Sequence, residues 1–133
     1  MNGKSDDPYA PPEVELPPQQ ERTLAAVAHA SAVFTLFIGP LIFYLTSKDK
    51  PFVRDNAREA LNFSISATLA FIVLVALAIV STLTMEFPEF ILLVLYWLRL
   101  ALVAASLFAV VTGAVIANSG EVYVYLVSLK LVR

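Results

Sequence analysis

Three stretches of the chain are apolar and free of charged side chains over lengths that would cross a membrane. Thr23 to Ser47 contains no Asp, Glu, Lys or Arg over 25 residues, and residues 60–85 and 100–120 contain none over 26 and 21 residues. About 20 residues of helix, at about 1.5 Å per residue, cross a hydrocarbon core of about 30 Å. The pattern therefore predicts membrane spans over residues 23–46, 62–84 and 97–118.

These spans are predicted to be helices. Lipid offers the backbone no hydrogen-bond partners, so a spanning segment either forms a helix or belongs to a closed barrel. Barrel strands alternate apolar and polar residues over about 10 positions, whereas residues 68–80 are apolar almost without interruption. We therefore predict an all-α integral membrane bundle of about three transmembrane helices.

The segments outside the spans are predicted from their polar residues. Residues 1–20 contain five prolines and several acids, which predicts a disordered tail that serves as a spacer or as a proline-rich ligand. Residues 21–133 form one membrane domain. Within it, Phe52, Val53 and Ala57 share one side at helical spacing, which predicts a short amphipathic interfacial helix over 52–61. Residues 121–133 are expected to lie along the membrane surface.

Two features set the limits of the first and third spans. Gly39-Pro40 interrupts the first span and predicts a kink, because proline removes a helical hydrogen bond and clashes with the preceding turn. The apolar run that ends at Asn118 is too long for one crossing. A span over 97–118 puts Trp97 and Arg99 at an interface, where aromatic and snorkelling side chains are typical, with residues 90–96 as an extension.

Composition agrees with a membrane protein and excludes several other classes. The chain has 133 residues, of which 59% are hydrophobic and 15% charged, against about half and a quarter in soluble domains. A net charge of −2 gives no reason to expect a nucleic-acid partner. The absence of cysteine excludes disulfides and thiolate chemistry.

The distribution of basic residues predicts an orientation in the bacterial cytoplasmic (inner) membrane. Basic residues near span ends favour the cytoplasmic side. They are most frequent in the first connection and the C-terminal segment, which predicts that both are cytoplasmic and that the N-terminal tail is outside. If the first segment only dips into the membrane, the N-terminus is inside as well. The basic residues of the favoured side are Lys48, Lys50, Arg54, Arg58, Lys130 and Arg133, and those of the other side are Lys4, Arg22 and Arg99.

A stripe of small residues follows one face of the third span. Small residues let helices approach closely, which drives their association in lipid. The stripe holds together the helices of one chain, or it faces another membrane protein or a second copy. Its members recur every four residues: Ala101, Ala105, Ala109, Gly113 and Ala117.

Several polar positions are candidates for function. His29, a costly polar group within a span, is either hydrogen-bonded between helices or handles protons; a lone histidine cannot build a usual zinc site. Arg99 lies at an interface or pairs with Glu86 or Glu89. A group of polar residues before the second span is denser than an ordinary loop requires. It meets lipid phosphates, or it forms a docking surface or a polar lid at the mouth of the bundle. Its members are Arg54, Arg58, Glu59 and Asn62, with Asp55 among them.

No arrangement of residues predicts catalysis. The sequence has no Gly-rich phosphate loop, no Ser-His-Asp arrangement and no metal-spaced cluster. Ser31 is two residues from His29, a spacing that puts the two side chains on different helix faces. We therefore expect no enzymatic activity, cofactor or metal.

Several blocks of sequence resemble a known family. They are Ala28-His29-Ala30-Ser31-Ala32, Gly39-Pro40-Leu41-Ile42-Phe43-Tyr44-Leu45, Lys48 to Arg54, Ala57 to Phe63, and Gly120-Glu121-x-Tyr123. Over residues 21–130 the chain resembles a widespread bacterial family of small membrane proteins of unknown function. That family is held to be distantly similar to the membrane-embedded import component of the chloroplast inner-envelope translocon. The chain departs from the family pattern at Val124-Tyr125-Leu126, where a basic residue and Tyr-Pro are usual.

The resemblance implies a fold and a membrane location more than an activity. From the residues we expect a non-enzymatic scaffold, assembly or accessory subunit that acts through helix–helix and lipid contacts. Its expected partners are membrane lipids, other membrane proteins or further copies of itself. The alternative is a component of an oligomeric translocation or conduction pore.

Overall fold

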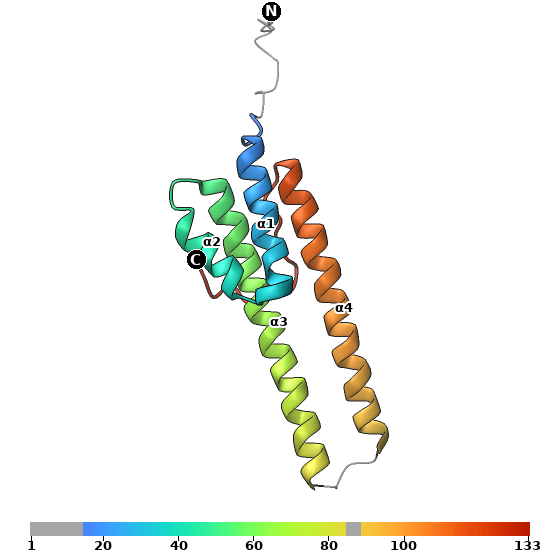
Figure 1. Ribbon diagram of the computed structural model, residues 1–133. Helices are drawn as coiled ribbons and strands as arrows, with labels where there is room; N and C mark the ends of the chain where they lie inside the picture. Colours follow the sequence, from blue (N-terminus) through green and yellow to red (C-terminus); the bar gives the residue numbers. More distant parts are fainter. Residues whose placement is uncertain (1–14, 85–88) are drawn as a thin grey trace, which may run out of the picture.

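The computed structural model describes residues 15–84 and 89–133, and these form four α-helices and no strand. The helices are α1 (Gln19–Thr35), α2 (Ile38–Thr46), α3 (Pro51–Thr84) and α4 (Glu89–Ser119), shown in Figure 1. The prediction of an all-α membrane protein is confirmed: α3 and α4, with 34 and 31 residues, are long and apolar enough to cross a membrane. Of the expected N-terminal tail, residues 1–14 lie outside the described residues, and Gln19 already belongs to α1.

The segment expected to be one kinked span over 23–46 is two helices that fold back on each other. The chain breaks at Leu36, whose φ is 54°, and α2 returns alongside α1 (Figure 1). Pro40 explains the position of the break, since its ring would clash with the carbonyl of residue 36 in a continuous helix. In the structure Pro40 lies in the first turn of α2, where a helix leaves amide donors without an internal partner.

Gly39 permits the close contact between α1 and α2. Its N–H donates to Thr35 Oγ1 over 2.9 Å, which supplies a partner for an amide of the first turn of α2. A Cβ at position 39 would lie 2.4 Å from the hydroxyl oxygens of both Ser31 and Thr35. The hairpin therefore requires glycine at this point.

The expected interfacial helix over 52–61 is not a separate element, because it is the first part of α3. Pro51 occupies the first position of the helix, which proline tolerates. No glycine or further proline interrupts the chain before Thr84. The amphipathic turns bury Val53, Ala57 and Leu61 against the rest of the protein. Burial of this apolar side makes the turns part of one straight element.

The helix α4 is likewise continuous, so residues 90–96 and the expected span over 97–118 are one element. It ends before Gly120, whose φ of 103° favours glycine. A Cβ at Gly120 would lie 3.4 Å from a Pro17 side-chain atom. The end of α4 therefore lies beside the start of α1.

The α1–α2 hairpin covers only half of the long helices. It lies against the first half of α3 and the second half of α4, while the other halves continue beyond it as a pair (Figure 1). We call this pair, residues 69–84 of α3 and 89–108 of α4, the two-helix extension. The start of α1, the α2–α3 connection and the end of α4 lie at the opposite end of the molecule.

Candidate functional site

Buried polar side chains of α1 and α3 hold the C-terminal segment, residues 120–133, against the helices. This segment forms no helix or strand. It was expected to lie along the membrane surface, but Tyr125 is only 3% exposed. We call the side chains that fix it the polar clasp. Its members are His29, Asn56, Glu59, Asn62, Ser66, Tyr125 and Lys130.

His29 is fully buried and uses both ring nitrogens. Nε2 lies 3.0 Å from Asn56 Oδ1, and Nδ1 lies 2.8 Å from the Tyr125 hydroxyl. An amide oxygen only accepts hydrogen bonds, so Nε2 carries the proton and Nδ1 accepts from Tyr125. Burial raises the pKa of Tyr125, which keeps its hydroxyl protonated and able to donate.

The side chain of Asn56 has a single orientation that satisfies its neighbours. Its Nδ2 donates to the Phe52 carbonyl over 3.1 Å. Its Oδ1 accepts from the N–H of Tyr123 over 3.3 Å, in addition to His29. Asn56 thus connects α1 to the C-terminal segment.

Aromatic packing encloses the buried histidine. The ring of Tyr125 stacks on Phe63 of α3 with centroids 4.1 Å apart and an angle of 10°. Tyr123 meets Tyr125 edge to face at 4.8 Å. Gly113 of α4 closes the other side, and a Cβ there would lie 2.9 Å from His29 Nδ1. These contacts exclude water from the hydrogen bonds of His29 and strengthen them.

The side chain of Asn62 binds the backbone of the last part of the C-terminal segment. Val132 N–H donates to Asn62 Oδ1 over 2.8 Å, and Asn62 Nδ2 donates to the Val132 carbonyl over 3.0 Å. Leu129 N–H donates to Ser66 Oγ over 2.7 Å. Lys130 forms an ion pair with Glu59, whose side chain is 8% exposed. Side chains therefore supply hydrogen-bond partners for the backbone of this segment, as a helix or sheet would do elsewhere.

The predicted small-residue stripe is used inside the chain along only part of its length. Gly113 and Ala117 are buried, and Ala109 is half-buried. Ala101 and Ala105 are exposed on the two-helix extension. The stripe therefore packs within the chain near its C-terminal end and faces outward on the extension.

The structure brings together three of the predicted polar positions and separates the others. His29, Glu59 and Asn62 all contact the C-terminal segment. Arg54 lies outside the polar clasp with its guanidinium 5.0 Å from the Tyr44 ring centroid. Arg58 forms a 3.3 Å ion pair with Asp55.

Arg99 is remote from all of these residues. It is half-buried on the two-helix extension. It forms no ion pair with Glu89 in the described part of the chain. Glu86, its other suggested partner, lies outside the described residues.

Sequence reasoning missed four members of the polar clasp, which are Asn56, Ser66, Tyr125 and Lys130. Asn56 lies between Asp55 and Arg58 of the predicted polar group, but nothing local marks it as buried. Tyr125 stands where the chain departs from the family pattern. Each binds a residue 27 to 96 positions away along the chain, and local periodicity carries no such information.

The arrangement is suited to holding a segment in place. Both nitrogens of His29 are engaged by neutral groups, and Ser31 Oγ donates to the Ala28 carbonyl of its own helix over 2.8 Å. Within 15–84 and 89–133, no group of three or more His, Cys, Asp or Glu side chains could hold a metal ion.

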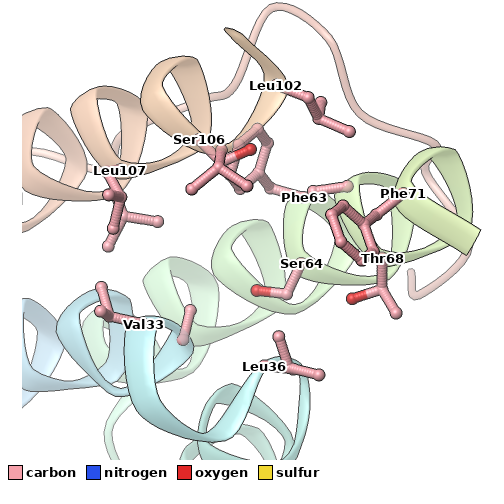
Figure 2. Close-up of a pocket in the computed structure, with 13 residues that line it drawn as sticks. Val33, Leu36, Phe63, Ser64, Thr68, Phe71, Leu102, Ser106 and Leu107 are labelled. Carbon is pink, nitrogen blue, oxygen red and sulfur yellow. The ribbon is translucent and has the colours of Figure 1, made fainter. Parts of the chain in front are cut away.

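A second feature is a cleft of about 300 Å³ between α1, α3 and α4, where the hairpin ends. Figure 2 shows Leu36 at one edge and the hydroxyls of Ser64, Thr68 and Ser106 among apolar side chains. The cleft thus lies at the boundary between the half of the molecule that the hairpin covers and the two-helix extension.

Comparison with known proteins gives a family and no further relative. No curated protein and no solved structure matches this chain. A family model described as the magnetosome magnetite crystal formation protein family matches residues 20–132. This agrees with the resemblance to small bacterial membrane proteins, and the match says nothing of the chloroplast translocon. The matched residues include the four helices, except for the first residue of α1, and almost all of the C-terminal segment. The chain therefore belongs to the magnetosome magnetite crystal formation protein family.

Proposed function

We propose that this protein is a non-enzymatic scaffold or accessory subunit of a membrane, acting through contacts with other membrane proteins, with further copies of itself and with lipid. In the setting that the family description gives, it would serve a membrane in which magnetite crystals form. The polar clasp supports this role by making one end of the molecule a fixed structure, against which partners can dock.

The two-helix extension is the observation that carries the proposal. Of its described residues, only Ser81 and Leu95 are buried. The apolar side chains that remain include Phe90, Trp97 and Phe108, which are 61%, 59% and 75% exposed. The chain's own helices do not cover this surface, so lipid or another protein must do so.

The exposed part of the small-residue stripe is the position at which a partner helix would approach. Ala101 and Ala105 lie four residues apart on the extension. Close helix contact in lipid depends on such small residues. Replacement by a large side chain would separate the helices while leaving the fold of the chain unchanged.

Assembly in native membranes tests the proposal. The full chain and the Ala105→Leu variant would be extracted with their surrounding lipid by a polymer, and the mass of each complex measured. We expect the unchanged chain in a complex larger than one copy, and the Ala105→Leu variant as a single copy. Ala104→Leu, also at an exposed position of α4, is the control and should retain the complex. A single copy of the unchanged chain without protein partners would overturn the proposal.

We further infer that the end bearing the α2–α3 connection faces the cytoplasm of the bacterial inner membrane. The support is the distribution of basic residues, which favour the cytoplasmic side. Arg99 is the one described basic residue on the extension. The others belong to the half that the hairpin covers: Arg22, Lys48, Lys50, Arg54, Arg58, Lys130 and Arg133. On this orientation the start of α1 is cytoplasmic too.

A second candidate function is an oligomeric translocation or conduction pore, which the translocon resemblance implies. The hydroxyls of Ser64, Thr68 and Ser106 in the cleft support it, since a conducting path needs polar groups (Figure 2). Solute flux across liposomes containing the purified protein separates the two functions. A scaffold gives no flux above empty vesicles.

A further inference from the structure

A small basic cavity lies at the end of the molecule where α3 begins. Its volume is about 190 Å³. It lies between the end of α2, the connection to α3, the first turns of α3 and the last residue of the C-terminal segment. The lining residues are Tyr44, Lys48, Pro51, Arg54, Asp55, Arg58 and Arg133.

The charge of this cavity is predominantly positive. Four lining side chains are cationic, and one, Asp55, is anionic. Asp55 pairs with Arg58 at 3.3 Å. The side chains of Lys48, Arg54 and Arg133 form no ion pair with any residue in 15–84 or 89–133. The lining side chains thus carry more positive charge than the one side-chain carboxylate among them balances.

Tyr44 holds the guanidinium of Arg54 in position. The guanidinium lies 5.0 Å from the ring centroid of Tyr44, and Arg54 Nη2 lies 3.4 Å from the hydroxyl oxygen. The same hydroxyl donates to the backbone oxygen of Arg133 over 3.2 Å. A fixed guanidinium presents its N–H groups as a fork that matches the oxygens of a phosphate.

The start of α3 adds to the attraction for an anion. Pro51, the first residue of a 34-residue helix, is part of the cavity wall. The positive end of the helix dipole therefore lies near the cavity.

The neighbourhood of the cavity distinguishes a lipid from a soluble anion. Ile42 and Leu45 on α2 are each 54% exposed, and Leu131 is 58% exposed. These apolar side chains stand one or two residues from Tyr44 or Arg133 along the chain. The long apolar run of α3 starts at Ala60, two residues after Arg58. A headgroup in the cavity would therefore have its acyl chains beside apolar surface.

We infer that this cavity binds the phosphate of an anionic phospholipid headgroup. Arg54 and Lys48 contact the phosphate oxygens, and the acyl chains lie along the exposed apolar side of α2. The inference rests on the proposed function, of which lipid contact is a part, and it names the lipid class and the residues.

Lipid titration of the full chain in micelles of a neutral detergent tests the inference. Phosphatidylglycerol and phosphatidylcholine would be added separately, and bound lipid counted by native mass spectrometry at physiological salt. We expect phosphatidylglycerol to bind more tightly than phosphatidylcholine. In the double variant Lys48→Gln, Arg54→Gln we expect the affinity for phosphatidylglycerol to fall roughly tenfold or more, since each basic residue near an anionic surface contributes measurably.

Lys50→Gln is the matched control. It removes one basic side chain from the same connection without touching the cavity, and it should leave the affinity within about twofold, as expected for a charge outside the site. Arg54→Lys keeps the charge and loses the fork, so it should retain part of the affinity and show that the loss is not due to unfolding. Equal weakening by Lys50→Gln, or equal binding of phosphatidylcholine, would overturn the inference.

Two further results distinguish lipid binding from the binding of free phosphate and from the scaffold role. If inorganic phosphate displaces the lipid at similar concentrations, the cavity binds free phosphate and the lipid assignment is wrong. If lipid selectivity is lost in the double variant while the native complex persists, the site is supported independently of the scaffold. If the unchanged chain prefers phosphatidylglycerol but forms no protein complex in native membranes, the scaffold role is overturned and the lipid site is not.

Discussion

Gly113 of α4 lies directly against His29 of α1, and a Cβ at position 113 would come within 2.9 Å of His29 Nδ1. The same Cβ would lie 2.8 Å from the Tyr125 hydroxyl oxygen. The glycine thus leaves the space in which the His29–Tyr125 hydrogen bond forms. A member of the small-residue stripe therefore serves the polar clasp as well as helix packing.

Replacement of this glycine should destabilise the protein. In Gly113→Ala the new methyl group forces His29 and Tyr125 apart, and buried overpacking of this kind costs about 1–3 kcal/mol. We expect a lower free energy of unfolding in detergent, measured by denaturant titration followed by circular dichroism. Ala104→Val adds volume at an exposed position of the same helix and should change little. Equal stability of both variants would show that the close contact is unimportant.

The His29–Tyr125 pair should behave as a coupled unit. His29→Leu leaves the buried Tyr125 hydroxyl without its acceptor, a loss of about 1–3 kcal/mol. Tyr125→Phe leaves Nδ1 without a donor. In the double variant neither group remains to be unpaired, so the total loss should be smaller than the sum of the single losses. Strict additivity of the unfolding free energies would contradict the hydrogen bond.

Asn62 should control the order of the last residues of the chain. Asn62→Leu removes both hydrogen bonds to Val132, so we expect Val132 N–H to exchange with deuterium at least several-fold faster, because its remaining protection depends on local opening. Asn118→Leu, at an exposed position of α4, provides the comparison. Unchanged exchange at Val132 in the Asn62 variant would show that the segment is held by other contacts.

The strained turn at Leu36 should tolerate glycine. Its φ of 54° is costly for a side chain with a Cβ, by about 1–3 kcal/mol. Leu36 is 56% exposed, so little packing is lost in Leu36→Gly. We expect equal or greater stability in this variant. Phe37→Gly, at a residue with φ −84°, should lower stability, because glycine there brings only added backbone entropy in the unfolded state. The reverse order would refute the turn geometry.

The folded-back hairpin predicts the accessibility of single cysteines. Because the chain has no cysteine of its own, Gln20→Cys, Asp49→Cys and Thr84→Cys each give one thiol. An impermeant thiol reagent applied to intact cells should label either both of the cysteines at positions 20 and 49 or neither of them. The cysteine at position 84 should give the opposite result. A different result at 20 than at 49 would mean that residues 23–46 cross the membrane once.

The sequence by itself determined the helical character and the two long helices. Two of the three charge-free runs lie within α3 and α4, where a helix meets the backbone's need for hydrogen-bond partners within each segment separately. The first run is as long, but it folds back as α1 and α2. The sequence also placed an irregularity at Gly39-Pro40, because the clash of proline with the preceding turn is local, but it predicted a kink in one span rather than two helices. His29 was singled out because a polar group within a span is costly, and Glu59 and Asn62 were singled out as members of a dense polar group.

The tertiary structure alone decided what those residues do. A proline predicts that a helix breaks, but the direction of the chain after Leu36 depends on how α1 and α2 pack on α3 and α4. The interfacial turns over 52–61 join α3 because the hairpin covers their apolar side. His29 and Tyr125 are 96 residues apart, and Asn62 and Val132 are 70 apart. Such pairs form only when packing brings distant segments together, so no periodicity in the sequence could reveal them.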